Sequence, residues 1–291
     1  MEGILGKQKS CSIIIVTYNS NSYINACLAP LADMSDVEVV VVDNDSSDGT
    51  AMQLKEKFPS VNLIALQNNV GFGRACNIGV AAASGSLVLL LNPDAVASAQ
   101  SIRTLIGFFE NHPRAGIAGG RLIDPSGLPL QSRGDTPTLV RLVLEKPIEW
   151  LAKRVNPCGV VHRALGKYSA KIRLPHEAES VSWVSGGALC CRRQVWNDTG
   201  GFDEKFFLYY EDVDLCLRAA QVGWDVWHVP DAVVSHQSGA SFAGNLNYQK
   251  RIYYASQRYF FQKYHGSVVA SLLSLAQKIY CWRQSWENAL L

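Results

Sequence analysis

The sequence predicts an α/β fold: a mostly parallel central sheet flanked by helices, followed by a C-terminal helical extension. Short apolar runs rich in β-branched residues alternate with helical patterns through the first 120 residues, as βαβ units do. The runs are apolar throughout, as in strands buried on both faces. With 48% hydrophobic and 18% charged residues, the chain is long enough to bury a large core, and its composition excludes intrinsic disorder.

The elements can be placed in chain order. Strands are expected at residues 12–16, 37–42, 61–66 and 87–91, with helices between them at 23–31, 49–58 and 74–83. A proline-containing stretch from 125 to 180 predicts loops and short helices. Regular structure returns over 181–192, followed by a helix at 212–221 and a strand at 225–229. The last two helices are expected at 248–264 and 267–291.

A change in composition places a boundary near residue 244. Residues 245–291 contain six Lys or Arg, one acidic residue and ten aromatic residues, so they carry +5, whereas residues 1–244 carry −3. The overall net charge of +2 therefore hides an asymmetry, but it argues against a dedicated nucleic-acid binder. We expect a catalytic or binding domain over 1–244 and a basic, aromatic tail over 245–291.

The tail contains one apolar row at helical spacing: Val268, Leu272, Leu275, Ile279, Trp282 and Trp286. Such a row packs on the chain's own domain, pairs with a second subunit as a short coiled coil, or lies in an anionic membrane surface. No apolar run is long enough for a signal-peptide core or a membrane span. The eight cysteines form no C-x-x-C pair, which favours reduced, buried thiols. We therefore expect a cytoplasmic protein, with peripheral contact to the inner face of the plasma membrane through the tail.

Polar residues follow each of the first four predicted strands. In an open α/β sheet, ligands bind beyond the carboxyl ends of the strands. Each polar position alone is explained by turn chemistry, but four at one edge favour a polar site. These positions are Thr17-Tyr18-Asn19, Asp43-Asn44-Asp45, Gln67-Asn68-Asn69 and Asn92-Pro93-Asp94.

Three further groups suggest chemistry. Asp94 could hold a divalent cation that neutralises a diphosphate, and His236 could join it if the fold brings the two together. Glu211 and Asp212 follow an aromatic stretch and open a helix; they complement the helix dipole or include a general base in a partly dry pocket. The segment around Gly73 and Arg74 lacks the third glycine of a dinucleotide fingerprint, which disfavours a dehydrogenase, although a phosphate could still approach there.

At this point the motifs resemble those of the family 2 glycosyltransferases of GT-A fold, the nucleotide-diphospho-sugar transferase fold. The resemblance is greatest to bacterial rhamnosyltransferases that build surface polysaccharides, and it covers Ser12 to about Phe242. It is carried by seven segments in order: SIIIVTYNS, VVVVDNDSSDGT, NNVGFGRACNIG, LLLNPDA, VSGGALCCRR, GFDEKFFLYYEDVDLCLR and HVPDAVVSHQSG.

The resemblance implies a donor-binding half over about 11–120 and an acceptor half over about 121–244. It implies a catalytic base at Asp212, paired with Glu211, and a metal held by Asp94 and His236. The donor would lie on Thr17, Tyr18, Asn19, Asp43, Asn44, Asn69, Gly73, Arg74 and Asn92, and the acceptor on Trp183, Gly186 and Gly187. Asn92 replaces the first carboxylate of the family's D-x-D motif, which weakens the expected metal site.

The implied activity is inverting, Mg²⁺- or Mn²⁺-dependent transfer of a sugar. The favoured donor is dTDP-rhamnose, and the expected acceptor is a saccharide or lipid-linked saccharide of a surface polysaccharide. Two alternatives stay open: a galactofuranosyl or hexosyl transferase that uses a UDP-sugar, and a non-catalytic nucleotide-sugar-binding or scaffold protein. Retention of Asp94 and of the Glu211-Asp212 pair argues against the second alternative.

Overall fold

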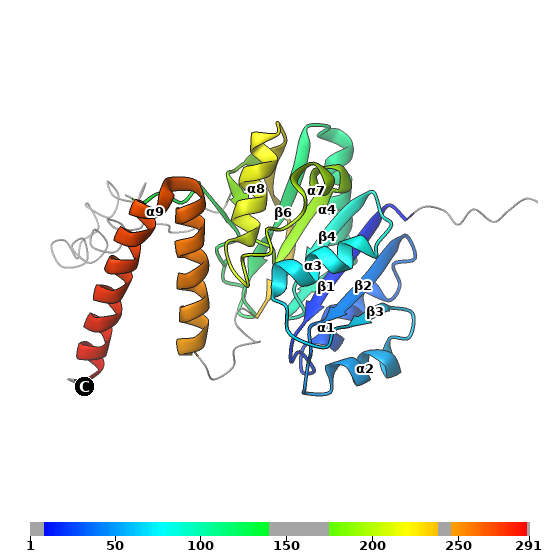
Figure 1. Cartoon of the computed structure of the whole chain (residues 1–291). Helices are drawn as coiled ribbons and strands as arrows, with labels where there is room; N and C mark the ends of the chain where they lie inside the picture. Colours follow the sequence, from blue (N-terminus) through cyan, green and yellow to red (C-terminus); the bar gives the residue numbers. More distant parts are fainter. Residues whose placement is uncertain (1–8, 140–174, 238–245, 290–291) are drawn as a thin grey trace, which may run out of the picture.

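A computed structural model describes residues 9–139, 175–237 and 246–289 of the chain, shown in colour in Figure 1. Its main feature is a mixed sheet, nine-stranded within the described residues, in the order β3-β2-β1-β4-β10-β6-β11-β5, with β8 beside β11. The strands are β1 (Cys11–Thr17), β2 (Val37–Asp43), β3 (Asn62–Ala65), β4 (Leu87–Leu91), β5 (Ala95–Ala97), β6 (Ala115–Ile123), β8 (Glu179–Ser180), β10 (Ala188–Arg192) and β11 (Asp225–His236). A separate ribbon pairs β7 (Arg133–Gly134) with β9 (Trp183–Val184).

The prediction of a mostly parallel sheet holds for one half of the sheet. Strands β3, β2, β1 and β4 are parallel neighbours. Beyond β4 the sheet is mixed, because β10 runs antiparallel to both β4 and β6, and β5 and β8 run antiparallel to β11. The carboxyl ends of β1, β2 and β4 therefore meet at one edge, as the sequence predicts, and β10 begins at that same edge.

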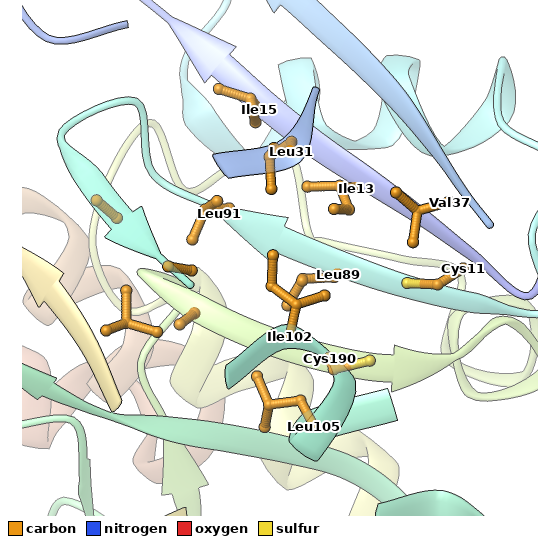
Figure 2. Packing of buried hydrophobic residues seen from close by; sticks show 14 of the residues in the cluster. Cys11, Ile13, Ile15, Leu31, Val37, Leu89, Leu91, Ile102, Leu105 and Cys190 are labelled. Atoms are coloured by element: carbon orange, nitrogen blue, oxygen red, sulfur yellow. The ribbon is translucent and has the colours of Figure 1, made fainter. Parts of the chain in front are cut away.

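Helices cover both faces of the sheet (Figure 1). One face packs against α1 (Ile24–Leu28), the 3-10 helix η1 (Ala29–Leu31), α2 (Thr50–Lys57) and α4 (Ala99–Asn111). Side chains of β1, β4 and β10 interlock with those of η1 and α4 in this layer (Figure 2). The other face packs against α3 (Phe72–Ala81), α7 (Arg193–Thr199) and α8 (Glu211–Gln221). The six cysteines within residues 9–139 and 175–237 are free and buried, as expected for reduced thiols.

The predicted strands and helices of the first 91 residues are confirmed to within about three residues at each end, but α4, β5 and β6 have no counterpart in the prediction. The sequence of strand β6, AGIAGGRLI, does not predict a strand because it contains three glycines. A Cβ on Gly119 would lie 2.4 Å from Cβ of Val184, and one on Gly120 would lie 2.6 Å from the carbonyl oxygen of Ala232. Close packing thus excludes the β-branched residues that normally mark a strand.

Strand β11 is longer than the predicted 225–229. It continues through an irregularity between Val229 and Val233, where Pro230 interrupts the pairing with β6, as proline does within sheets. The strand ends at His236, which pairs in register with Ala95 at the start of β5. The extra length carries His236 to the edge where β4 ends.

The tail forms the helix α9 (Leu246–Ala289), which bends at Gly266 (φ 84°) into two limbs that fold back beside each other (Figure 1). The bend confirms the two helices expected there. The packed face differs from the predicted row: Leu273 is buried and Val269 packs with it, whereas Val268, Leu272 and Leu275 are 75%, 55% and 57% exposed. The side chains of Ile279, Trp282 and Trp286 lie outside the described part of the chain.

Among the described residues, no helix is long and apolar enough to cross a membrane.

Candidate active site

The first part of the site lies at the ends of β1 and β2. Thr17 and Asp43 end these strands in register, and the Thr17 hydroxyl donates to Oδ1 of Asp43 over 2.8 Å, with both side chains buried. Oδ2 of Asp43 accepts from the N–H of Ser46 at 3.2 Å. Tyr18 follows Thr17 at 38% exposure, so its ring is accessible to solvent. Asn19 has a left-handed backbone (φ 51°) and accepts from the N–H of Ser47.

The second part is the turn between β3 and α3. Asn44, buried after β2, donates to Oδ1 of Asn69 at 2.9 Å and accepts from the N–H of Val70 at 2.9 Å. Oδ1 of Asn69 also accepts from the N–H of Gly71 at 3.0 Å. Two of the predicted donor-binding amides thus hold each other and shape this turn. Their side-chain bonds explain why polar residues follow these strands.

The predicted residues of α3 lie in two different environments. Gly73 is buried, and a Cβ there would lie 3.2 Å from Cβ of Phe202 and 3.7 Å from Cβ of Glu211. Close packing of α3 on the acidic loop accounts for this glycine. Arg74 is exposed on the surface and pairs with Glu204, Nε to Oε2, at 3.4 Å. Its guanidinium is therefore available to solvent and to a ligand.

The third part brings together Asn92, Asp94 and His236. Nε2 of His236 lies 3.2 Å from Oδ1 of Asp94 and 3.0 Å from Nδ2 of Asn92. The backbone fixes this corner as well, because the N–H of Gln237 donates to the carbonyl of Asp94 at 3.1 Å. The condition set by the sequence, that the fold bring His236 to Asp94, is met.

This donor set fits a divalent cation only in part. Among residues 9–139, 175–237 and 246–289, no group of three or more His, Cys, Asp or Glu side chains is arranged to hold a metal ion. Asp94 and His236 offer one carboxylate and one imidazole. Mg²⁺ commonly takes one or two carboxylates and completes its shell with substrate phosphate oxygens and water. The residues therefore fit a cation that arrives with a diphosphate, and they do not form an all-protein cage.

The fourth part is the acidic pair at the start of α8. Oδ2 of Asp212 accepts from the N–H of Gly186 at 2.9 Å, and Oδ1 accepts from the N–H of Val213 at 2.8 Å. Burial raises the pKa of Asp212 above its ordinary value, although these backbone N–H groups oppose the shift. A carboxylate with a raised pKa that is held at both oxygens is a suitable proton acceptor.

Glu211 has a different character. Its side chain is only 4% exposed, and Oε2 has no hydrogen-bond partner in the part of the chain that the structure describes. Burial, and then the negative charge of Asp212, raise the pKa of Glu211 well above its usual range. These surroundings disfavour the charged form of Glu211 more strongly than that of Asp212, whose two oxygens accept from backbone N–H groups.

A turn through two glycines joins the acidic pair to the corner formed by Asn92, Asp94 and His236. Gly186 donates its N–H to Asp212, and the carbonyl of Gly187 accepts from the N–H of Asn92 at 3.2 Å. A Cβ on Gly186 would lie 3.7 Å from Cβ of Asp212, and one on Gly187 would lie 3.0 Å from Leu122. These glycines thus bring Asp212 and Asn92 close together. Sequence reasoning missed this role, since a backbone donor leaves no residue-type signal.

Trp183 lies on β9, close to the same turn. Its indole Nε1–H donates to the carbonyl of Asp135 at 3.0 Å, and its ring covers Gly134. It is partly buried and packs against two hydrophobic clusters. One lies on the sheet face covered by α8, and the other includes Phe206, Phe260 and Phe261 between the acidic loop and α9. Residues 140–174, the larger part of the proline-containing stretch, lie outside the described residues.

The fold is that of the GT-A glycosyltransferases, and within it the edge of the sheet gathers the residues described above. The chain belongs to glycosyl transferase family 2, whose family model matches residues 12–168, and is thus a glycosyltransferase.

Its curated relatives include rhamnosyltransferases. The chain is 31% identical to N-acetylglucosaminyl-diphospho-decaprenol L-rhamnosyltransferase of Mycobacterium tuberculosis (strain ATCC 25618 / H37Rv), over 79% of this chain and 76% of that protein. It is 27% identical to rhamnosyltransferase WbbL of Escherichia coli (strain K12), over 75% and 80% of the two chains.

Solved structures share the fold at lower identity. S. aureus TarS 1-349 matches with a TM-score of 0.53 and 19% identity, over 87% of this chain and 72% of that one. The mannosyltransferase PcManGT of Pyrobaculum calidifontis, solved with GDP-Man and Mn²⁺, matches with a TM-score of 0.53 and 15% identity, over 97% and 84%.

Proposed function

We propose that this glycosyltransferase transfers L-rhamnose from dTDP-rhamnose, with inversion, to a saccharide or lipid-linked saccharide acceptor. The observation that carries the proposal is the turn through Gly186 and Gly187, which holds the half-buried Asp212 next to the corner formed by Asn92, Asp94 and His236. A proton acceptor and a site for a leaving diphosphate are the two groups that such a reaction needs. The choice of sugar is supported by the rhamnosyltransferase relatives.

In the proposed mechanism, the nucleobase lies against Tyr18, and Asp43 accepts from its N–H. Asp212 takes the proton of the acceptor hydroxyl as the hydroxyl oxygen bonds to the anomeric carbon. The bond from that carbon to the diphosphate breaks on the opposite face, so the configuration inverts. General-base assistance of this kind is typically worth about 10²–10⁴-fold.

The leaving diphosphate acquires negative charge that needs compensation. Asp94 and His236 would hold a divalent cation, which would stabilise that charge when it is bound. Relatives in fold support this assignment, because PcManGT and GalNAc-T7 were both solved with Mn²⁺. Arg74, exposed beside Glu204, adds a cation that the diphosphate could recruit.

The acceptor of one relative and the surface of the tail both support contact with a membrane. One relative is named for a diphospho-decaprenol acceptor, and the second limb of α9 exposes Val268, Leu272 and Leu275 next to the exposed Lys278. An apolar row on a tail of net charge +5 is complementary to an anionic lipid surface. We propose that the tail lies on such a surface; dimer formation without vesicle binding would assign the row to a second subunit instead.

A donor panel tests the function. Release of nucleoside diphosphate would be measured from dTDP-rhamnose and from UDP- and GDP-sugars, each with Mg²⁺ or Mn²⁺. We expect the highest rate with dTDP-rhamnose. A preference for a UDP-sugar would support the galactofuranosyl or hexosyl alternative, in line with the hexosyltransferase Agl10 of Haloferax volcanii, which is 27% identical over 72% of this chain and 61% of that protein. No turnover with any donor would point to a scaffold role.

A further inference from the structure

The turn that delivers the acidic pair has an unfavourable backbone. Tyr209 and Tyr210 both have φ of 70°, and Tyr210 is the residue from which α8 starts. Left-handed conformations in consecutive non-glycine residues are unfavourable, and they persist only where surrounding contacts impose them. Asp212 lies two residues beyond, so whatever holds these tyrosines also sets the position of Asp212.

The contacts that hold the turn come from the first limb of α9. The Tyr210 side chain is only 7% exposed, and its ring packs against Phe260 with 5.1 Å between ring centroids. Its hydroxyl oxygen accepts from Nε2 of Gln257 at 2.8 Å. Ser256 donates to the carbonyl of Leu208 at 2.7 Å. The tail thus bonds to both the side chain and the main chain of this turn.

The orientation of the Gln257 amide is fixed by the second limb. Oε1 of Gln257 accepts from Nε2 of Gln277 at 2.7 Å, and Oε1 of Gln277 accepts from Arg258 at 2.9 Å. Because the Gln257 oxygen is occupied, its NH₂ group must face Tyr210. Gln257 and Gln277 are 4% and 8% exposed, so water cannot readily replace these bonds.

The first turn of α8 is held in the same way. Asp214 is fully buried, and its carboxylate accepts from Lys263 at 2.6 Å, from the Tyr264 hydroxyl at 2.7 Å and from Arg218 at 2.8 Å. Its N–H donates to the carbonyl of Tyr210 at 2.9 Å. Two residues of α9 and one of α8 therefore compensate this buried charge. Asp212 lies between Tyr210 and Asp214, which are both held by α9.

We propose that Gln257 of the C-terminal helix is a positioning residue for the catalytic base: through the Tyr210 hydroxyl it fixes the turn that aims Asp212 at the acceptor. The proposal rests on the proposed role of Asp212. A displacement of about 1 Å at a reacting group can cost about 10²-fold in rate. Through Gln257, the tail thus helps to position the base, in addition to any role at a membrane.

The test compares Gln257→Leu with Tyr210→Phe in the full-length protein. Both variants remove the bond between Gln257 and Tyr210; Tyr210→Phe also removes the 3.4 Å contact with the Tyr253 hydroxyl, and Gln257→Leu the bond from Gln277. We expect each to lower kcat by about 10–100-fold while the donor Kd changes less than about twofold. Tyr210→Phe keeps the aromatic ring and its packing, so it carries the test if Gln257→Leu does not fold. Tyr259→Phe is the matched control, because it removes a 2.8 Å bond from the same helix to Asp203 in the same loop; its kcat should stay near the wild-type value.

The Asp212→Asn background separates positioning from a general structural role. If Gln257 acts through the base, Gln257→Leu adds no further loss to the residual rate of Asp212→Asn. An equal further loss in that background, or a Gln257→Leu kcat like that of Tyr259→Phe, would overturn the proposal and leave the role of Asp212 intact. A near-normal rate for Asp212→Asn itself would instead refute the proposed function.

Discussion

Substitution of Gly71 by alanine should damage the structure at the contact between α3 and the acidic loop. Gly71 precedes α3 with φ 88° and ψ 163°, a region open essentially to glycine alone. A Cβ there would lie 2.7 Å from the carbonyl oxygen of Phe207 and 3.0 Å from its ring. That same carbonyl accepts from the N–H of Phe72 at 2.8 Å, so the backbone cannot retreat without breaking the bond.

Two costs add at this position. A forbidden backbone conformation costs about 1–3 kcal/mol, and forcing a methyl group into a filled space costs about 1–3 kcal/mol more. We therefore expect Gly71→Ala to lower the free energy of unfolding by about 3 kcal/mol. For a domain of this size, that corresponds to a fall in Tm of about 6–12 °C. Activity should fall as well, because the displaced loop leads to Asp212.

Thermal unfolding followed by circular dichroism measures the effect. Gly107→Ala is the matched control, since Gly107 lies within α4 and a Cβ there meets no atom within 4 Å. Alanine in an open helical position favours folding by up to about 1 kcal/mol, so the Tm of this control should stay the same or rise. If Gly71→Ala unfolds within about 1 °C of the wild type, the close contact between α3 and Phe207 is wrong.

Three further predictions concern metal use, pH and lipid. Asp94→Ala and His236→Ala should abolish transfer or raise the Mg²⁺ concentration needed for it; equal turnover in EDTA and Mg²⁺ would contradict a metal role. Burial and two nearby arginines lower the pKa of His228 to about 4. As the pH falls, the unfolded state therefore takes up this proton before the folded state does, so the free energy of unfolding should rise by up to about 3 kcal/mol from pH 4 to 6.5. His228→Phe should flatten the denaturant-measured stability over that range. Leu272→Glu should reduce pelleting with anionic vesicles. Met52→Glu is the control, at a residue that is 64% exposed on α2, and it should pellet like the wild type; equal pelleting of the two variants would exclude lipid contact through the exposed row of the tail.

The sequence predicts most reliably the strands whose residue types match their environment. Strands β1, β2 and β4 are apolar and rich in branched residues because both of their faces are buried. Strand β6 is equally buried, but close neighbours force glycine at Gly116, Gly119 and Gly120, so its residue types resemble those of a loop. The mixed half of the sheet depends on this strand and therefore could not be predicted.

The tail shows a different limit of sequence reasoning. Val268, Leu272 and Leu275 form one row at helical spacing, and Val269 and Leu273 form the adjacent row. Periodicity predicts an apolar side of the helix, but it cannot decide which of two neighbouring rows packs inward. The shorter row faces the core because it packs with Phe260 and Phe261 of the first limb. Gln277, one turn beyond Leu273, bonds to Gln257 of the same limb.

The candidate site was predictable where side chains carry the chemistry. Asp94, His236 and Asp212 are marked by residue type and by their positions after strands or at a helix start. The backbone N–H of Gly186 and the buried anchoring of Asp214 by Lys263 and Tyr264 depend on segments far apart in the chain. Asp214 in particular resembles a residue that complements the helix dipole, whereas the structure shows a fully buried carboxylate with three cationic or hydroxyl donors.

The most direct test of the central claim is single-turnover sugar transfer by Asp212→Asn, measured together with donor binding by calorimetry. We expect a rate lowered by about 10²–10⁴-fold and a donor Kd within about twofold of the wild-type value. The Asp212 carboxylate bonds to Gly186 and Val213, whereas Thr17 and Asp43, proposed at the nucleobase, bond to each other. A transfer rate close to that of the wild type, with the donor bound equally well, would show that another group accepts the proton.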